Sequence, residues 1–338
     1  MGSMWPVASL AGDQGATDCR LRQLASIDLQ IGSAVLIPVT VDGTSASMTL
    51  NSGLPTSIIY QQVATEMKLA IVQAPAPYAN FPGMVRINSM SLGSFDAGKI
   101  QLLVVSHGPM PTPGLPTSIG SIAIPAGILP RPGARFRMDF ELDFAHKKLN
   151  LFSTTHCPGK VVYWADKAAA IPYTIDKLGT AVFPIELDGK KISSALQVGS
   201  PSTLIHVDAS KAFYGFDEHS EGIRHDTSNS GKTVNHYRAM QMTLPGLSVL
   251  NADVKLVPGL AKCWVSPNWG PEHSATYGNC YGNPPLTLGG DVLQHLRLYF
   301  ATEEHVLYVT AADATLPTES DESNERLRIV VTPAQTEH

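Results

Sequence analysis

The sequence predicts a mainly β protein made of two similar lobes with short helices. Glycine (28) and proline (25) are frequent among the 338 residues, whereas Asp, Glu, Lys and Arg together make up only 16%. Turn-forming residues between β-branched runs indicate many short strands. So little charge is unlike the composition of coiled coils and long exposed helices. The third observation, an internal repeat, determines the architecture.

The repeat is a 23-residue segment that occurs twice. Residues 37–59 align without a gap with residues 183–205, at an offset of 146 positions. The identical pairs are Pro38/Pro184, Asp42/Asp188, Gly43/Gly189, Ser47/Ser193, Leu50/Leu196, Gly53/Gly199, Pro55/Pro201 and Ile59/Ile205. In each copy a strand (37–41, 183–187) leads through Asp-Gly, a strong hairpin signal, into a second strand (47–50, 193–196). A turn of small residues, an apolar strand and a short helix near 60–69 or 209–214 follow.

The two halves also end alike, each with a short helix and then a β-hairpin. These elements are expected at 124–129 and 142–152 in the first half, and at 288–293 and 298–308 in the second. The chain therefore divides into an N-terminal segment (1–31), lobe 1 (32–157), lobe 2 (162–312) and a polar tail (313–338). The acidic run in the tail predicts a solvated segment.

Composition excludes several functions. The formal net charge of -5 carries no basic footprint for nucleic acid. No apolar run approaches the roughly 18 residues that a membrane-spanning helix needs. Acidic residues and histidines near 217–226 lack the spacing of a helical zinc site, and Gly231-Lys232-Thr233 lacks the leading glycine of a phosphate-binding loop. We therefore expect no nucleic-acid partner, no membrane span, no metal and no cofactor.

The four cysteines predict two disulfides. Cys263 and Cys280 bracket a loop of Pro, Gly, Trp and Asn, where a disulfide would contribute about 3 kcal/mol by closing the loop. Cys19 and Cys157 bracket lobe 1, so a bond between them would tie its two ends together. Four free thiols in a reducing compartment are the alternative. Two disulfides would indicate an oxidising compartment, so we expect a periplasmic or secreted protein.

The order of elements in the two copies resembles that of a known family. A strand, an Asp-Gly hairpin, a strand, a small turn, an apolar strand and a helix are closed by Gly290-Asp291-Val292-Leu293 and a hairpin. This order resembles the pepsin-like aspartic peptidases, and more closely the two-lobed retropepsin-like proteins of bacteria, over nearly all of residues 19–311. The resemblance implies that each lobe is a β-barrel and that each small turn carries a catalytic Asp in Asp-Thr-Gly or Asp-Ser-Gly. In that family the two carboxylates share a proton, so that one acts as base on a water and the other as acid.

The sequence departs from that family at both catalytic positions. The turns are Asn51-Ser52-Gly53 and Gln197-Val198-Gly199, and neither holds a carboxylate. Amides do not titrate and cannot act as a general base. Asn51 is nearly isosteric with Asp and keeps the family's Ser-Gly after it, as an inactivated enzyme would. The second turn departs further, because Gln197 is longer than Asp and Val198 stands where the family has Thr or Ser.

Two segments correspond to the mobile hairpins, or flaps, that cover the cleft in this family. In lobe 1 the segment 74–83 contains several prolines together with Tyr78 and Phe81, and in lobe 2 the segment 223–243 contains a Ser-Asn-Ser-Gly turn and Tyr237. We predict Tyr78, Phe81 and Tyr237 as contacts to a bound chain. Ordinary surface loops are the alternative for both segments.

Three functional hypotheses follow. The first is a non-catalytic aspartic-peptidase-like protein that binds an extended peptide or protein partner in the cleft between its lobes. The second is an aspartic endopeptidase seen as an inactivated variant, with Asn in place of Asp at position 51. The third is a structural or assembly module whose cleft has no ligand.

Overall fold

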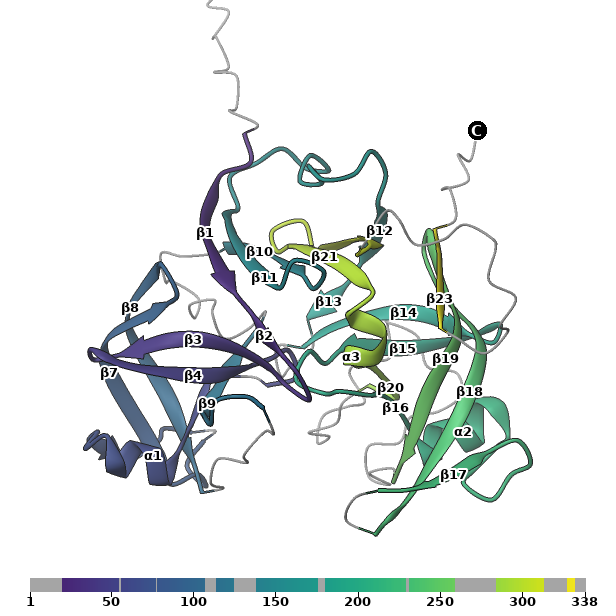
Figure 1. The fold of residues 1–338 in the computed structure, drawn as a ribbon, viewed down its shortest axis with the longest axis horizontal. Coiled ribbons are helices and arrows are strands. Elements are labelled where there is room, and N and C mark those ends of the chain that lie inside the picture. The colour runs from purple at the N-terminus through teal and green to yellow at the C-terminus, as the bar shows by residue number, and fades with distance from the viewer. Residues whose placement is uncertain are drawn as a thin grey trace, which may run out of the picture.

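The computed structural model describes residues 20–54, 56–76, 78–106, 114–124, 138–175, 180–228, 231–258, 284–312 and 327–331. These residues form two closed β-barrels that flank a six-stranded sheet, with three short helices (Figure 1). The expected fold class, mainly β with two barrel lobes and short helices, is confirmed.

Lobe 1 is a barrel of six strands. In sheet order they are β3 (Val35–Val41), β4 (Thr44–Asn51), β9 (Ser118–Ala123), β5 (Ile58–Tyr60), β8 (Phe95–Val105) and β7 (Gly83–Leu92). Pairing of β3 with β7 closes the barrel. Short strands β2 (Gln30–Ile31) and β6 (Ile71–Val72) extend the ends of this sheet, and helix α1 (Gln61–Glu66) follows β5.

Lobe 2 repeats this arrangement strand for strand. Its barrel contains β14 (Ala181–Leu187), β15 (Lys190–Leu196), β20 (Leu286–Leu288), β16 (Thr203–His206), β19 (Leu247–Val257) and β18 (Thr233–Leu244). Pairing of β14 with β18 closes it. Strands β13 (Thr174–Ile175) and β17 (Arg224–Thr227) take the places of β2 and β6, and helix α2 (Val207–Tyr214) follows β16. The internal repeat is therefore a repeat of topology.

The two Asp-Gly hairpins also close the barrels. Asp42 and Gly43 have φ of 45° and 85°, and Asp188 and Gly189 have 47° and 77°, the double positive φ of a tight type I′ turn. The Asp42 carboxylate accepts two main-chain N–H groups from β7, and the Asp188 carboxylate accepts the N–H of Gln241 from β18. Each Asp thus joins its hairpin to the strand that seals its barrel, which gives the identical Asp a structural role in both copies.

A third sheet joins the halves. Its strands, in order, are β1 (Gln23–Asp28), β11 (Lys148–Ser153), β10 (Met138–Asp143), β21 (Leu296–Ala301), β22 (Val306–Ala311) and β12 (Ala169–Pro172). Helix α3 (Gly290–Leu293) leads into β21. Because β10 closes the first half and β21 the second, their pairing is the joint between the two copies.

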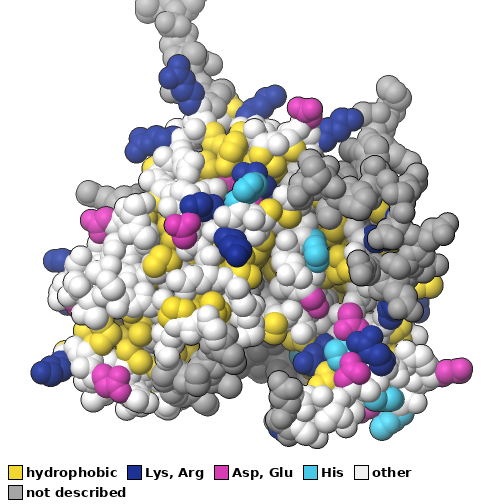
Figure 2. Space-filling model, in the orientation of Figure 1, with side chains coloured by type: hydrophobic (Ala, Val, Ile, Leu, Met, Phe, Trp, Pro, Cys, Tyr) yellow, Lys and Arg dark blue, Asp and Glu magenta, His cyan; other side chains and the backbone are white. Residues whose placement is uncertain are grey.

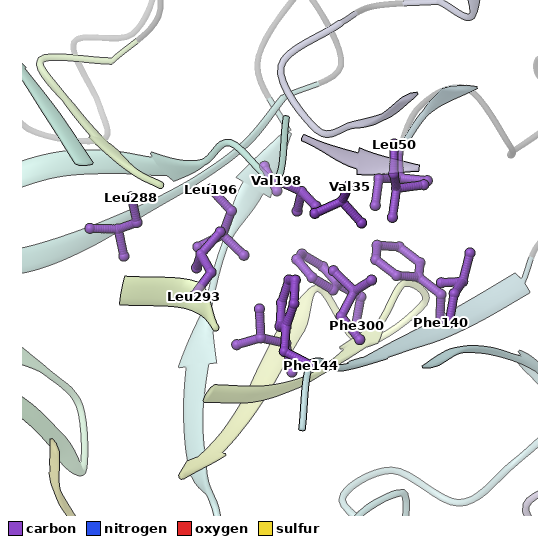
Figure 3. Close-up of a cluster of buried hydrophobic side chains, with 14 of the residues drawn as sticks. Val35, Leu50, Phe140, Phe144, Leu196, Val198, Leu288, Leu293 and Phe300 are labelled. Carbon is purple, nitrogen blue, oxygen red and sulfur yellow. The ribbon is translucent and has the colours of Figure 1, made fainter. Parts of the chain in front are cut away.

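One face of this sheet packs into a core that both lobes share. Phe140 of β10 stacks on Phe300 of β21 with ring centroids 4.4 Å apart. Leu50 from lobe 1 and Leu196 from lobe 2 reach the same cluster (Figure 3). Leu50 immediately precedes the turn Asn51-Ser52-Gly53 and Leu196 the turn Gln197-Val198-Gly199, so both turns lie on a common apolar base.

The other face of the sheet holds a buried polar network. The three acidic residues of β10, which are Asp139, Glu141 and Asp143, are at most 3% exposed. The Asp139 carboxylate contacts His156 Nε2 at 2.5 Å and accepts a hydrogen bond from the Tyr299 hydroxyl. Glu141 accepts hydrogen bonds from the guanidinium of Arg297 and from the Tyr163 hydroxyl, and burial together with Glu141 raises the pKa of Tyr163 to about 12. Burying such acids is tolerable only because each is paired and hydrogen-bonded.

Part of the C-terminal region, which was expected to be a solvated tail, is a paired strand. Residues 328–331 form strand β23 (Arg328–Val331), which pairs with β19. The acidic run before it dominated the sequence-based prediction. The β-branched stretch Leu327-Arg328-Ile329-Val330-Val331 carries a strand signal that the prediction missed.

Removing Arg297 should destabilise the fold strongly. In Arg297→Ala, Glu141 and Asp143 lose their shared cation while staying buried, and breaking a buried ion pair typically costs about 3–5 kcal/mol. Lys148→Ala is the matched control, because its ion pair with Asp28 joins two strands of the same sheet but is solvent-exposed, where a pair contributes about 0–1 kcal/mol. Urea unfolding of both variants measures the difference. Equal losses would show that the network does not hold the sheet together.

Candidate site between the two lobes

The two small turns occupy equivalent places. Asn51 is the last residue of β4, and Gln197 directly follows β15. The main-chain oxygen of Asn51 accepts the N–H of Ile124 at 2.7 Å, and the N–H of Gln197 donates to the oxygen of Leu288 at 2.9 Å. In both lobes a parallel strand, β9 or β20, therefore fixes the turn where its strand ends.

The structure brings Asn51 and Gln197 together across the lobe interface. A Cβ atom placed on Gly53 would lie 3.5 Å from the amide carbon and nitrogen of Gln197, and 3.6 Å from Oδ1 of Asn51. A Cβ atom on Gly199 would lie 3.0 Å from Nδ2 of Asn51. The two glycines thus leave the space that lets the amides approach each other.

Hydrogen bonding fixes how the Asn51 amide is turned. The N–H of Gly53 donates to Oδ1 of Asn51 at 2.8 Å, so the oxygen faces its own turn and Nδ2 is directed toward Gly199. Within the described residues, no group accepts a hydrogen bond from Nδ2 of Asn51 or from the amide nitrogen of Gln197. The pair therefore offers hydrogen-bond donors and no base.

Ser52 ties the two turns to each other. Its side chain is buried, with 4% exposed. Oγ donates to the main-chain oxygen of Leu196 at 2.6 Å and accepts the N–H of Val198 at 3.0 Å. Val198, the counterpart of Ser52, is also buried but has no hydroxyl, so it cannot return these bonds. A single hydroxyl therefore makes the side-chain link between the turns.

Asp291 supports the second turn from behind. It follows Gly289-Gly290, and the N–H of Gly290 donates to the oxygen of Ser200 at 2.8 Å. The Asp291 carboxylate accepts bonds from the N–H and the hydroxyl of Thr203, at 2.8 and 2.7 Å. Burial raises the pKa of this carboxyl, against the lowering effect of those bonds. These contacts assign Asp291 to holding strand β16 against the turn.

The lobe 1 flap lies on the barrel edge formed by β6 and β7. Tyr78 is half-buried against a small cluster that includes Ala74 and Met84. Phe81 is 43% exposed, and its ring meets that of Tyr78 edge-on at 6.2 Å. Phe81 thus presents an apolar surface to solvent, while Tyr78 anchors the segment. Their contact with a bound chain stays a prediction.

Tyr237 is engaged within lobe 2. Its ring stacks on Phe216 with centroids 4.3 Å apart, and its hydroxyl donates to Asp188 at 2.5 Å. Burial and the neighbouring carboxylate raise the pKa of Tyr237. These contacts make Tyr237 part of the packing between β18 and the Asp-Gly hairpin, a role that its position in the sequence did not suggest.

Figure 2 shows charged side chains scattered over this face of the molecule, with apolar side chains between them. Within the described residues, no helix has the length and apolar character to cross a membrane. In the same part of the chain, no three His, Cys, Asp or Glu side chains are grouped to hold a metal.

Several predicted features fall outside the described residues. These are Cys19, Cys263 and Cys280, and the expected helix beyond Ile124. Cys157 is described, and its thiol is not free. Both disulfide pairings stay predictions.

Comparison with known protein families and with curated proteins gives no relative. No model of a known protein family matches the chain, and no curated protein matches it. The geometry of the site is therefore the evidence on function.

Ser52→Ala should loosen the joint between the two turns. The variant leaves the buried N–H of Val198 and the oxygen of Leu196 without their partner, and an orphaned buried group costs about 1–3 kcal/mol. Ser52→Thr keeps the hydroxyl and should recover most of the free energy of unfolding. Urea melts of both variants measure this. A Ser52→Ala variant as stable as the parent would show that the bridge is dispensable.

Proposed function

We propose that this protein is a non-catalytic relative of the two-lobed aspartic peptidases that binds an extended peptide or protein segment between its lobes. The observation that carries the proposal is the pair of amides, Asn51 and Gln197, at the place where that family has its carboxylates. The bilobal barrel fold and the meeting of the two turns support the resemblance. The amides remove the acid–base chemistry and leave the binding surfaces.

The binding half of the proposal follows from how extended chains are recognised. A peptide in β conformation is held mainly by main-chain hydrogen bonds, which do not need a catalytic carboxylate. The unpaired amide nitrogens at the turns can donate to a carbonyl oxygen of such a chain. Exposed Phe81 on the lobe 1 flap supplies the aromatic contact that commonly anchors an interface.

The cysteines bear on the compartment of the protein, because two disulfides would need an oxidising one. We propose that it is periplasmic or secreted and that Cys19 pairs with Cys157 and Cys263 with Cys280. The occupied thiol of Cys157 supports the first pair. Peptide mapping under non-reducing conditions tests both pairs, and four free thiols would refute them together with the localisation.

The parent chain should cleave no peptide at acid pH. Without a carboxylate to activate water, the loss of general acid–base catalysis alone costs about 10²–10⁴ in rate. A mixed-peptide digest between about pH 3 and 6, followed by mass spectrometry, should match a blank. Asn51→Asp alone should also be inactive, because one carboxylate cannot form a pair that shares a proton. The combination of Asn51→Asp with Gln197→Asp is the positive control for peptide cleavage.

Cleavage by the parent would favour the alternative function. If the parent cuts peptides reproducibly and Asn51→Ala abolishes this, the protein is an endopeptidase with an unusual site. If the parent neither cuts nor binds any peptide more tightly than about 1 mM, the structural-module hypothesis holds instead.

Peptide binding should be insensitive to pH between about 4 and 7, because amides do not titrate. Asn51→Asp replaces a donor by a group that ionises near pH 3.9. Its affinity should therefore fall as pH rises through that range, since the carboxylate repels a carbonyl oxygen. Calorimetry on a peptide-library binder at several pH values measures this. Identical profiles for parent and variant would place the peptide away from Asn51.

Phe81→Ala should weaken the same peptide about tenfold, as loss of an interface anchor does. Ile175→Ala is the matched control, because Ile175 is an equally exposed apolar residue (44%) on β13, outside both flaps. The same calorimetric titration compares the two variants with the parent. Equal affinity for both variants would remove the lobe 1 flap from the binding surface.

A further inference from the structure

The outer edge of β19 holds a strand from a distant part of the sequence. Strand β23 pairs antiparallel with the first part of β19, with Val249 opposite Ile329 and Leu250 opposite Arg328. The other side of this part of β19 is paired with β18. Residues 313–326 separate β23 from the strands of the central sheet, so β23 is added to the barrel from outside rather than being a member of its closed ring.

Side-chain packing and main-chain pairing hold β23 in place. Leu327 and Ile329 pack against the hydrophobic core, while Val330 is 42% exposed. Among the described residues, no ion pair or side-chain hydrogen bond fastens residues 327–330. Within residues 327–330 the attachment depends on two apolar side chains and a short ladder, so we expect β23 to open more readily than the barrel strands.

The edge beneath β23 is suited to a strand from elsewhere. Strand β16 pairs with β19 only from Thr203 opposite Val254 onward. Without β23 the N–H and C=O groups of Ser248 and Leu250, which face away from β18, would therefore be unpaired. An unpaired edge beside an apolar surface is a template for strand addition. Leu247 and Val249 of this edge are at most 1% exposed and supply that apolar surface.

We propose that the edge of β19 at Leu247–Leu250 is a second binding site, which takes an extended peptide with apolar residues at alternate positions. The chain's own segment Leu327–Val331 occupies it as a built-in competitor. The pattern of that segment defines the ligand class: apolar side chains two residues apart that face the barrel, with an exposed residue after them. This site is separate from the cleft and does not depend on the function proposed for it.

Competition makes the proposal testable in the full chain. The probe is a labelled synthetic peptide covering residues 325–333. In the parent it must displace β23, whose tether gives an effective concentration of the order of mM. Ile329→Ser weakens β23 without touching β19, so it should bind the probe at least about tenfold more tightly than the parent. Val330→Ser, the matched control on the same strand, should bind it within about twofold of the parent.

Two further measurements test where the probe binds and whether it binds through main-chain hydrogen bonds. Hydrogen exchange should show that the probe protects the amides of Ser248 and Leu250 in Ile329→Ser, which global unfolding of the variant would not produce. A probe with proline at the Arg328 position should not bind, because Arg328 pairs with Leu250, whose main-chain groups face β23, and the proline ring removes the donor of that pair. Equal probe affinity for parent and Ile329→Ser, or protection elsewhere, would overturn the proposal. A parent dimer that Ile329→Ser abolishes would assign the edge to a second copy and overturn the peptide site.

Discussion

The pairing of β10 with β21 is the constraint on which the rest of the structure depends. Each strand is the first strand of the hairpin that ends one half of the chain, so their register sets how the halves meet. Phe140 and Phe300 stack across this joint, and the core beneath them extends to Leu50 and Leu196. Because those two leucines precede the two turns, the joint determines that Asn51 and Gln197 face each other. The buried acids on the other face, with Arg297 and His156, fix the same register from the outside.

A pair of amides at this meeting point has different electrostatics from a pair of carboxylates. Two close carboxylates cannot both ionise, so a carboxylate pair has to hold a shared proton against repulsion. Two amides carry no charge, and their approach across Gly53 and Gly199 needs no proton. The two turns can then be linked from one side alone. Ser52 makes both side-chain hydrogen bonds to the second turn, and Val198, its counterpart there, contributes only an apolar side chain.

The sequence predicted the architecture well because duplication leaves a strong signal. The Asp-Gly pairs located both hairpins, and the aligned turns led to the site. Positions whose role depends on a distant partner could not be predicted. Tyr237 was predicted as a contact to a bound chain, which stays a prediction, but the hydrogen bond from its hydroxyl to Asp188, 49 residues earlier, could not be predicted. Strand β23 was missed because an acidic run precedes it and its partner β19 is remote in sequence.

The two halves of β19 explain why a separate strand can be added to a closed barrel. Asn251 has a φ of 58°, a left-handed conformation that interrupts regular extended backbone. Before it, residues 247–250 pair with β23; after it, residues 254–257 pair with β16. The interruption divides one edge into two, so an occupant of the first half does not compete with β16. Strand β18 pairs with both halves, and the barrel therefore stays closed whether or not the first half is covered.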